Sequence, residues 1–159
     1  MGARVILASR GRDRLEAAQK AGPVDLVQAN GTEAEALRSA GPFDVVAECT
    51  GSDNLDGIIG QGFGGPKLLR RRGGRLVLVA GRDRVNYSAN AAQGGKVSIF
   101  HCTHFEQHHL QDVLGHFLEG RMQSRPFLQD VVPASRIVEI YEVLRDRPQD
   151  LFGTIFTWE

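Results

Sequence analysis

Short apolar runs alternate with amphipathic segments along the chain. The run at residues 4–8 is followed by a segment in which Leu15, Ala18 and Ala21 recur at helical spacing. Further apolar runs predict four more strands, at residues 24–29, 43–51, 75–81 and 96–103. Strands that alternate with helices are typical of a mostly parallel sheet with helices on both faces. The pattern therefore predicts an α/β fold.

The segments between and after these runs predict helices. Thr32 and Glu35 form a T-x-x-E capping box, which favours a helix that ends near residues 41–42. Residues 106–120 place apolar side chains on one helix face, and residues 135–145 repeat this pattern. A polar connection precedes that last helix, and the chain closes with a strand at its C-terminus. With 159 residues, the chain is long enough for one domain.

Residues 60–65 read GQGFGG and match the dinucleotide-binding pattern G-x-G-x-x-G. The pattern marks a phosphate site only where a strand leads into a helix whose N-terminus receives the pyrophosphate. Residues 66–72 leave only about two helical turns before the next glycines. We therefore expect a surface glycine loop between two helical pieces, the first capped by Asn54, rather than a phosphate cradle.

The charge balance gives no reason to expect a nucleic acid or a membrane as partner. Lys plus Arg and Asp plus Glu number 19 each, so the net charge is zero. No apolar run approaches the roughly 20 residues of a membrane span, and the basic, polar start lacks a signal-peptide core. The local run Arg70–Arg72 is expected to lie at a helix end, where cations complement the helix dipole.

The two cysteines, Cys49 and Cys102, lie far apart in the sequence and form no C-x-x-C pair. This usage favours a reducing compartment, and we expect a cytoplasmic protein. Cys49 is expected to be a small, buried core residue. The five histidines are expected to be solvated or capping rather than zinc ligands; they are His101, His104, His108, His109 and His116.

Ligands of an open parallel sheet bind outside the carboxyl ends of its strands. The first such exit carries Ser9 and Arg10, followed by Arg12 and Arg14. A hydroxyl and guanidinium groups suit the 2′-phosphate of NADP, whereas an acidic residue there would hold the ribose diol of NAD. The alternative is a solvated surface loop. Two later exits are small turns that let a flat ligand approach the backbone; they are residues 49–52 and 80–82.

Four segments, in this order and spacing, carry a family resemblance: RVILASRGRDRLEAAQKAG, FDVVAECTGS, GGRLVLVAG and VVPASRIVEIYEVLRDRPQDLFGTIFTW. Together they resemble the cofactor domain of the medium-chain, zinc-type alcohol dehydrogenase superfamily, from Gly2 to Trp158. The resemblance implies binding of NADP(H), with NAD(H) less favoured, and hydride transfer to a carbonyl, alcohol or activated alkene.

The resemblance also implies which residues contact the cofactor. Ser9 stands where NAD-preferring members have an acidic residue, which favours NADPH. The full set of cofactor-binding candidates is Ser9, Arg10, Arg14, Thr50, Gly51, Ser52, Ala80, Gly81, Arg82, His101, Cys102 and Thr103. Many members dimerise through a sheet edge, and we expect a homodimer through residues 96–103 or pairing with a complementing chain.

The family's first strand, its glycine fingerprint and its zinc-bearing domain would all precede Gly2. We therefore expect a single partial dinucleotide-binding domain over residues 1–159, with no catalytic residue and no zinc. The chain is then a fragment of an enzyme, a truncated product or one half of an assembly. A non-catalytic oligomerisation or regulatory module is the alternative. The missing strand would be central, so its neighbours must pair directly, borrow a strand or keep unsatisfied backbone groups.

Overall fold

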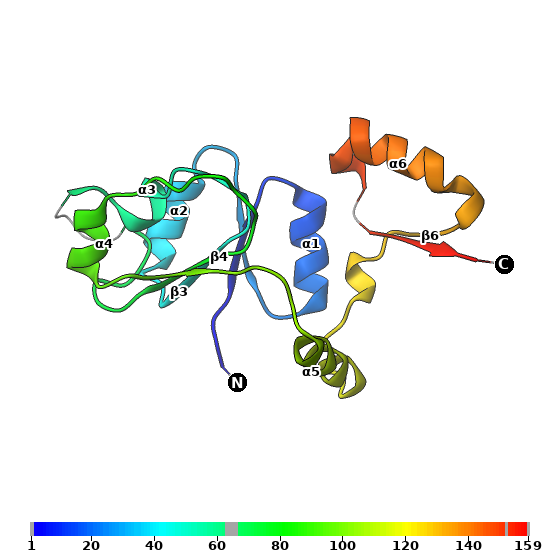
Figure 1. The fold of residues 1–159 in the computed structure, drawn as a ribbon, viewed down its shortest axis with the longest axis horizontal. Helices are drawn as coiled ribbons and strands as arrows, with labels where there is room; N and C mark the ends of the chain where they lie inside the picture. Colours follow the sequence, from blue (N-terminus) through cyan, green and yellow to red (C-terminus); the bar gives the residue numbers. More distant parts are fainter. Residues whose placement is uncertain (1, 63–66, 152, 159) are drawn as a thin grey trace. The chain divides into compact units, whose positions relative to one another are not determined.

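The computed structural model describes residues 2–62, 67–151 and 153–158, which form two compact units (Figure 1). One unit consists of residues 31–106. Its elements are α2 (Glu33–Ala40), β3 (Val45–Glu48), α3 (Asp56–Ile59), β4 (Arg75–Leu78), α4 (Ala89–Gly95) and β5 (Ser98–His101).

The other unit consists of residues 1–30 and 107–159. Its elements are β1 (Ile6–Ser9), α1 (Arg12–Ala21), β2 (Asp25–Gln28), α5 (Gln107–Leu118), β6 (Asp130–Pro133), α6 (Ile137–Asp146), β7 (Thr154–Thr157) and three short 3-10 helices.

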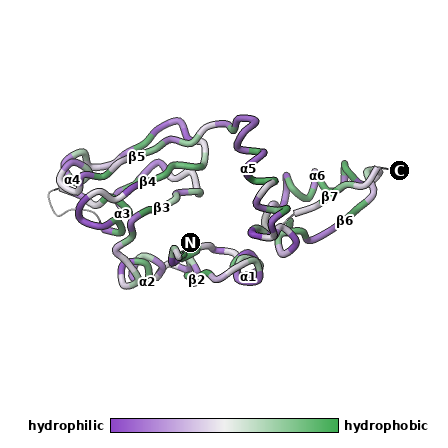
Figure 2. The backbone as a smooth tube through the Cα atoms, turned by 90° about the horizontal axis from the view of Figure 1, so that it is seen from below, coloured by the Kyte–Doolittle hydropathy of each residue, from purple (hydrophilic) through white to green (hydrophobic). Residues whose placement is uncertain are grey.

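Strands β3, β4 and β5 form a parallel sheet with β4 in the centre. Val46, Leu76 and Ile99 lie in one row across it. The central strand is the apolar run LVL after Arg75, which Figure 2 shows as hydrophobic residues. A strand buried on its inner face needs such side chains, and Leu76 has no exposed surface.

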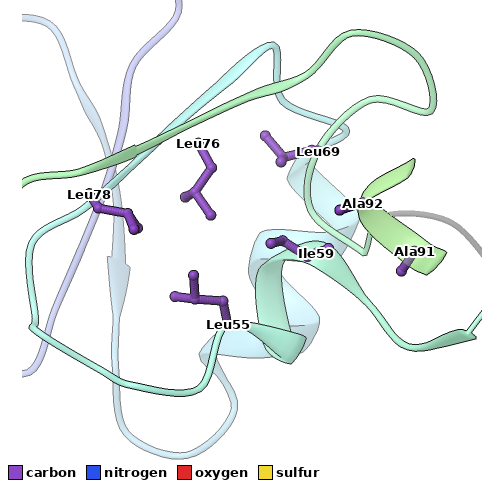
Figure 3. Close-up of a cluster of buried hydrophobic side chains, with 7 residues drawn as sticks. All are labelled: Leu55, Ile59, Leu69, Leu76, Leu78, Ala91 and Ala92. Carbon is purple, nitrogen blue, oxygen red and sulfur yellow. The ribbon is translucent and has the colours of Figure 1, made fainter. Parts of the chain in front are cut away.

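The core of this unit lies against one face of the sheet (Figure 3). Helices α3 and α4 pack small and branched side chains onto the leucines of β4; the cluster is Leu55, Ile59, Leu69, Leu76, Leu78, Ala91 and Ala92. The other face carries Val45, Val79 and Phe100, which are about half exposed. The inner face of this small sheet therefore supplies most of its packing energy.

In the other unit, α1 packs against β1 and β2, and its residues Leu15, Ala17 and Ala18 are buried. Strands β1 and β2 pair in parallel, as do β6 and β7. None of the described residues of α5 and α6 is buried. No helix in the described ranges is both long and apolar enough to cross a membrane.

The predicted α/β class and parallel strands are confirmed, with strands shorter than the apolar runs that encode them. The strands divide among three sheets, and β1 and β3 are each outermost in their own sheet. On β3, the carbonyls of Asp44 and Glu48 accept hydrogen bonds from β4, so the peptide groups of Val45 and Ala47 face the open edge.

Several local predictions are wrong. Residues 67–72 form no helix, so Arg70–Arg72 lies on a turn into β4 rather than at a helix end. The capping box is not formed in the described part of the chain, because the α2 start is closed by hydrogen bonds from Glu35 N–H to the Thr32 carbonyl and from Gly31 N–H to Glu33. Residues 63–65 of the glycine stretch lie outside the described residues.

Replacement of Leu76 by alanine tests the core. Because Leu76 is fully buried, we expect a loss of about 2–5 kcal/mol in the free energy of unfolding. The matched control is Val79→Ala, a half-exposed residue directly after β4, which is expected to cost under about 1 kcal/mol. Urea unfolding followed by circular dichroism measures both, and equal losses would contradict this assignment of the core.

Candidate functional site

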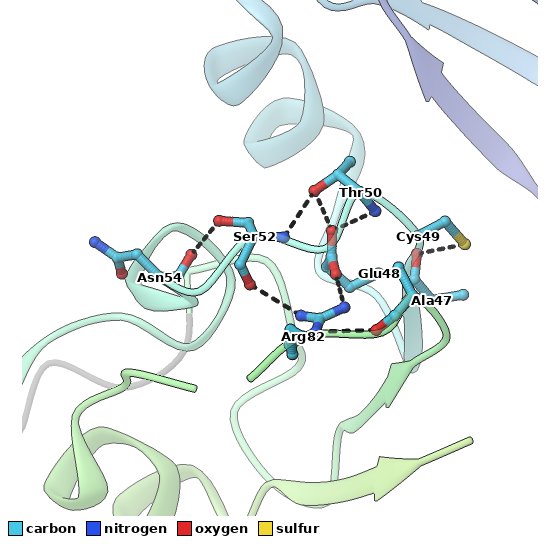
Figure 4. Close-up of polar contacts among 8 residues, drawn as sticks. Ala47, Glu48, Cys49, Thr50, Ser52, Asn54 and Arg82 are labelled. Carbon is cyan, nitrogen blue, oxygen red and sulfur yellow. Dashed lines mark hydrogen bonds and ion pairs between the residues drawn. The ribbon is translucent and has the colours of Figure 1, made fainter. Parts of the chain in front are cut away.

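The exit of β3 is organised by a buried carboxylate, Glu48 (Figure 4). Its Oε1 accepts hydrogen bonds from the backbone N–H of Thr50, at 2.7 Å, and from the Thr50 hydroxyl. The Thr50 hydroxyl in turn accepts from Ser52 N–H at 3.3 Å. One carboxylate therefore folds the chain into the turn that follows the strand.

Arg82, two residues after the β4 exit at Ala80, completes this network. Its guanidinium donates to the Ala80 carbonyl at 3.1 Å and to the Ser52 carbonyl at 2.9 Å, and it forms an ion pair with Glu48. The Arg82 and Glu48 side chains are only 4% and 6% exposed. The two strand exits are thus joined by a buried charge pair in which each side-chain nitrogen and oxygen has a hydrogen-bond partner, which is the arrangement that makes such burial tolerable.

The network holds Glu48 in its ionised form. Burial alone would raise the pKa of Glu48, but the hydrogen bonds from Thr50 and the guanidinium of Arg82 outweigh it. The pKa of Glu48 consequently lies below its ordinary value.

Gly51 brings the two exits into direct contact. Its φ is +78°, and a Cβ at this position would lie 3.3 Å from the Gly81 carbonyl oxygen and 3.7 Å from Ala80 Cβ. Both the backbone conformation and the space favour glycine. The turns at residues 50–52 and 80–82 therefore form one continuous surface at the carboxyl edge of the sheet.

The β5 exit lies in the same row. His101 is in register with Leu78 and, across β4, with Glu48. The backbone N–H of Cys102 donates to the Leu78 carbonyl at 3.0 Å, and the side chains of His101, Cys102 and Thr103 are exposed. The structure thus brings the predicted residues of three exits to one edge; these are Thr50, Gly51, Ser52, Ala80, Gly81, Arg82, His101, Cys102 and Thr103.

The β1 exit belongs to the other compact unit. The Ser9 hydroxyl accepts a hydrogen bond from Gly11 N–H at 3.3 Å, which shapes the turn into α1. Arg12 is paired with Glu16 at 2.9 Å, whereas Arg10 and Arg14 are exposed and form no ion pair among the described residues. Two guanidinium groups beside a helix start therefore remain available for an anion.

The structure bears on two further predictions, the burial of Cys49 and the role of the histidines. Cys49 is exposed rather than buried, because it follows β3 on the side opposite the buried Glu48. Of the histidines, the rings of His108 and His109 lie next to each other, with a centroid distance of 3.9 Å and a tilt of 48° between their planes. Across the described ranges, no group of three or more His, Cys, Asp or Glu side chains is arranged to hold a metal ion.

Sequence reasoning missed the pairing of Glu48 with Arg82. A signal existed, because Glu48 closes the apolar run VVAE and a carboxylate on the inward side of a strand needs a buried cationic partner. What the sequence does not reveal is which arginine approaches, since the partner lies 34 residues further along the chain.

Neither a protein-family model nor a curated protein matches the sequence. Solved structures do match. A structure described as a short-chain alcohol dehydrogenase from Escherichia coli CFT073, complexed with NADH, has a TM-score of 0.80 at 14% identity, over 97% of this chain and 44% of its own. L-idonate 5-dehydrogenase from E. coli K-12 has a TM-score of 0.76 at 18% identity, over 98% of this chain and 43% of its own. A cobalt- and zinc-bound thermostable alcohol dehydrogenase from Pyrobaculum aerophilum has a TM-score of 0.70 at 25% identity, over 98% of this chain and 43% of its own.

The chain therefore has the fold of a Rossmann-like dehydrogenase domain. The resemblance to the medium-chain, zinc-type alcohol dehydrogenase superfamily, and to its C-terminal cofactor-binding part, is confirmed. The chain spans less than half the length of these enzymes.

The buried pair can be tested by pH. Since the folded-state pKa of Glu48 is below the ordinary 4.5, the pair stabilises the fold above pH 4.5 and the contribution is lost as pH falls through the folded pKa. We expect Glu48→Gln to cost about 3–5 kcal/mol at neutral pH, because it leaves Arg82 buried and unpaired.

The matched control is Glu16→Gln, whose exposed pair with Arg12 is worth about 0.3–0.5 kcal/mol. Urea unfolding at several pH values gives the comparison. The acid-dependent part of stability should shrink in Glu48→Gln and persist in Glu16→Gln, and a wild-type-like pH profile in Glu48→Gln would refute the role of the pair.

Proposed function

We propose that this chain is a partial NADP(H)-binding domain of a medium-chain dehydrogenase-type oxidoreductase, in the cytoplasm. In the complete enzyme, the cofactor would exchange a hydride with a carbonyl, an alcohol or an activated alkene. The observation that carries the proposal is the common carboxyl edge formed by the exits of β3, β4 and β5. The E. coli structure complexed with NADH, which has the same fold, supports a nicotinamide dinucleotide as ligand.

The roles of the residues follow from their surroundings. The turns at residues 50–52 and 80–82 would present backbone groups and the exposed Ser52 to the ribose and the nicotinamide. Arg82 would contribute through its backbone, since its guanidinium is already bonded to Glu48 and two carbonyls. His101, Cys102 and Thr103 would line the nicotinamide side.

The preference for NADP(H) over NAD(H) rests on the β1 exit. Arg10 and Arg14 are exposed and form no ion pair in the described part of the chain, and Ser9 carries a hydroxyl instead of a carboxylate. A 2′-phosphate accepts charge-assisted hydrogen bonds from guanidinium groups, whereas a free ribose 2′-hydroxyl gains little from them. These side chains therefore fit the phosphate.

Isothermal titration with NADPH and NADH tests this preference. We expect Arg10→Gln and Arg14→Gln each to weaken NADPH binding about tenfold or more, with NADH binding unchanged, because each removes a charge-assisted contact to the 2′-phosphate. Arg12→Gln is the control, since Arg12 is already paired with Glu16. Tighter binding of NADH than NADPH by the wild-type chain, or no binding of either, would contradict the proposal.

The open edge of β5 supports a homodimer through residues 96–103. Ser98 N–H and Cys102 N–H donate to carbonyls of the β4 segment, so the amides of Ile99 and His101 face away from it. Phe100 is half exposed on the outer face. An edge with free backbone groups and an apolar side chain is suited to pairing with a second copy. The alternative function, a non-catalytic oligomerisation module, would use this same edge.

Concentration-dependent hydrogen exchange tests the dimer. In the paired edge, the amides of Ile99 and His101 should exchange more slowly at high protein concentration, whereas the amide of Cys102, already bonded to Leu78, should change little. Light scattering gives the mass in parallel. A monomer at all concentrations, with unchanged exchange, would contradict the dimer. Turnover by the isolated chain would eliminate the non-catalytic alternative.

A further inference from the structure

A tight turn, Arg70–Gly74, lies at the amino-terminal end of β4. Arg70 fixes it from within, donating to the Asp44 carboxylate at 2.7 Å and to the Arg72 carbonyl at 3.0 Å. Gly73 has a φ of +77°, and its N–H donates to the Gly95 carbonyl at the end of α4, at 3.1 Å. The turn is therefore held against the ends of both β3 and α4.

Basic side chains gather on this turn and beside it. Ser98 N–H donates to the Gly74 carbonyl, which places the start of β5, and Lys96 before it, next to the turn. We call this set the basic turn; its exposed members are Arg71, Arg72, Arg75 and Lys96. No ion pair is recorded for these four within the described ranges, and the neighbouring carboxylate of Asp44 is occupied by Arg70.

Several arginines elsewhere in the chain are neutralised by a nearby carboxylate. Arg12, Arg136 and Arg145 each have a carboxylate within four residues and are paired with it. By contrast, residues 67–75 contain several cations and no acidic residue. Adjacent like charges repel, so this grouping lowers the stability of the fold.

A structural role in the fold explains only one of the cations of the basic turn. A cation near the C-terminus of α4 complements the helix dipole, and Lys96 directly follows the last residue, Gly95. That interaction falls off within one helical turn and needs one charge. The guanidinium groups of Arg71, Arg72 and Arg75 remain without a structural role.

We propose that the basic turn binds an acidic segment of a partner polypeptide. Guanidinium groups bind carboxylates through paired hydrogen bonds, and several spaced cations favour a ligand that carries several anionic groups along one chain. Solvent-exposed cations hold a single small anion weakly, because each exposed charge pair gains little free energy.

A nucleic acid fits the basic turn less well. Stable binding to a phosphodiester backbone uses several phosphate contacts and a favourable long-range field. The chain has equal numbers of basic and acidic residues, 19 of each, and several of its cations elsewhere are paired with carboxylates. The local charge of one turn matches a short acidic segment better than a long polyphosphate.

The basic turn lies at the opposite end of the strands from the candidate cofactor edge. Arg75 begins β4, whereas residues 80–82 follow its carboxyl end. Binding of an acidic segment therefore does not require cofactor binding, and the two can be tested separately.

Fluorescence anisotropy with a labelled oligoglutamate peptide tests the proposal on the full chain. We expect saturable binding that weakens as salt is added, and about tenfold weaker binding by the variant Arg71→Gln/Arg72→Gln/Arg75→Gln. The matched control is Lys20→Gln/Arg38→Gln/Arg125→Gln, which removes the same charge from exposed positions elsewhere and should bind like the wild type.

Three results would overturn the proposal. They are an equal loss of affinity in the control variant, no saturable binding by the wild type at low salt, and tighter binding of a short DNA duplex of matched charge than of the peptide. Circular dichroism of each variant verifies that the exposed substitutions leave the fold intact.

Discussion

The buried ion pair between Glu48 and Arg82 is the interaction on which the candidate site depends. It is costly to bury, and it is tolerated because each oxygen and nitrogen involved has a partner in the turns that it joins. The core beneath it is different in kind, because apolar packing around Leu76 stabilises the sheet without fixing the shape of any loop. The packing thus determines that β3 and β4 lie side by side, and the ion pair determines how the chain leaves them.

Much of the fold could be predicted from the sequence because apolar runs and helical periodicity are local signals. The runs around Leu7, Val46 and Leu76 each became strands, and the amphipathic stripe of residues 106–120 became α5. The failures have physical causes. Helix α4 was not predicted because its sequence, ANAAQGG, has no apolar stripe, although the Ser88 hydroxyl accepts the capping hydrogen bond from Ala91 N–H. Strand β6 was read as a connection because its pairing with β7 depends on residues more than 20 positions away.

The residues of the candidate site could be predicted as far as the ends of the strands could be predicted from the sequence. Residues 50–52, 80–82 and 101–103 meet at one edge because parallel strands in register must end together. The contacts within that edge were not predictable, since they depend on side chains such as Arg82 reaching from the exit of β4 to that of the neighbouring β3. Cys49 shows a second limit of prediction from the sequence. Its residue type favours burial, but the alternation of the strand places it on the exposed side.

The contact between Gly51 and the Gly81 carbonyl leaves little freedom for sequence change at this point of the site. A side chain at position 51 would need both an unfavourable φ and room that the facing carbonyl oxygen takes up. Sequence change in this turn is easier at Ser52, whose side chain is exposed, than at Thr50, whose hydroxyl is bonded to Glu48. The spacing between the two turns is therefore fixed at Gly51, whereas the polarity of the exposed surface beside it can change.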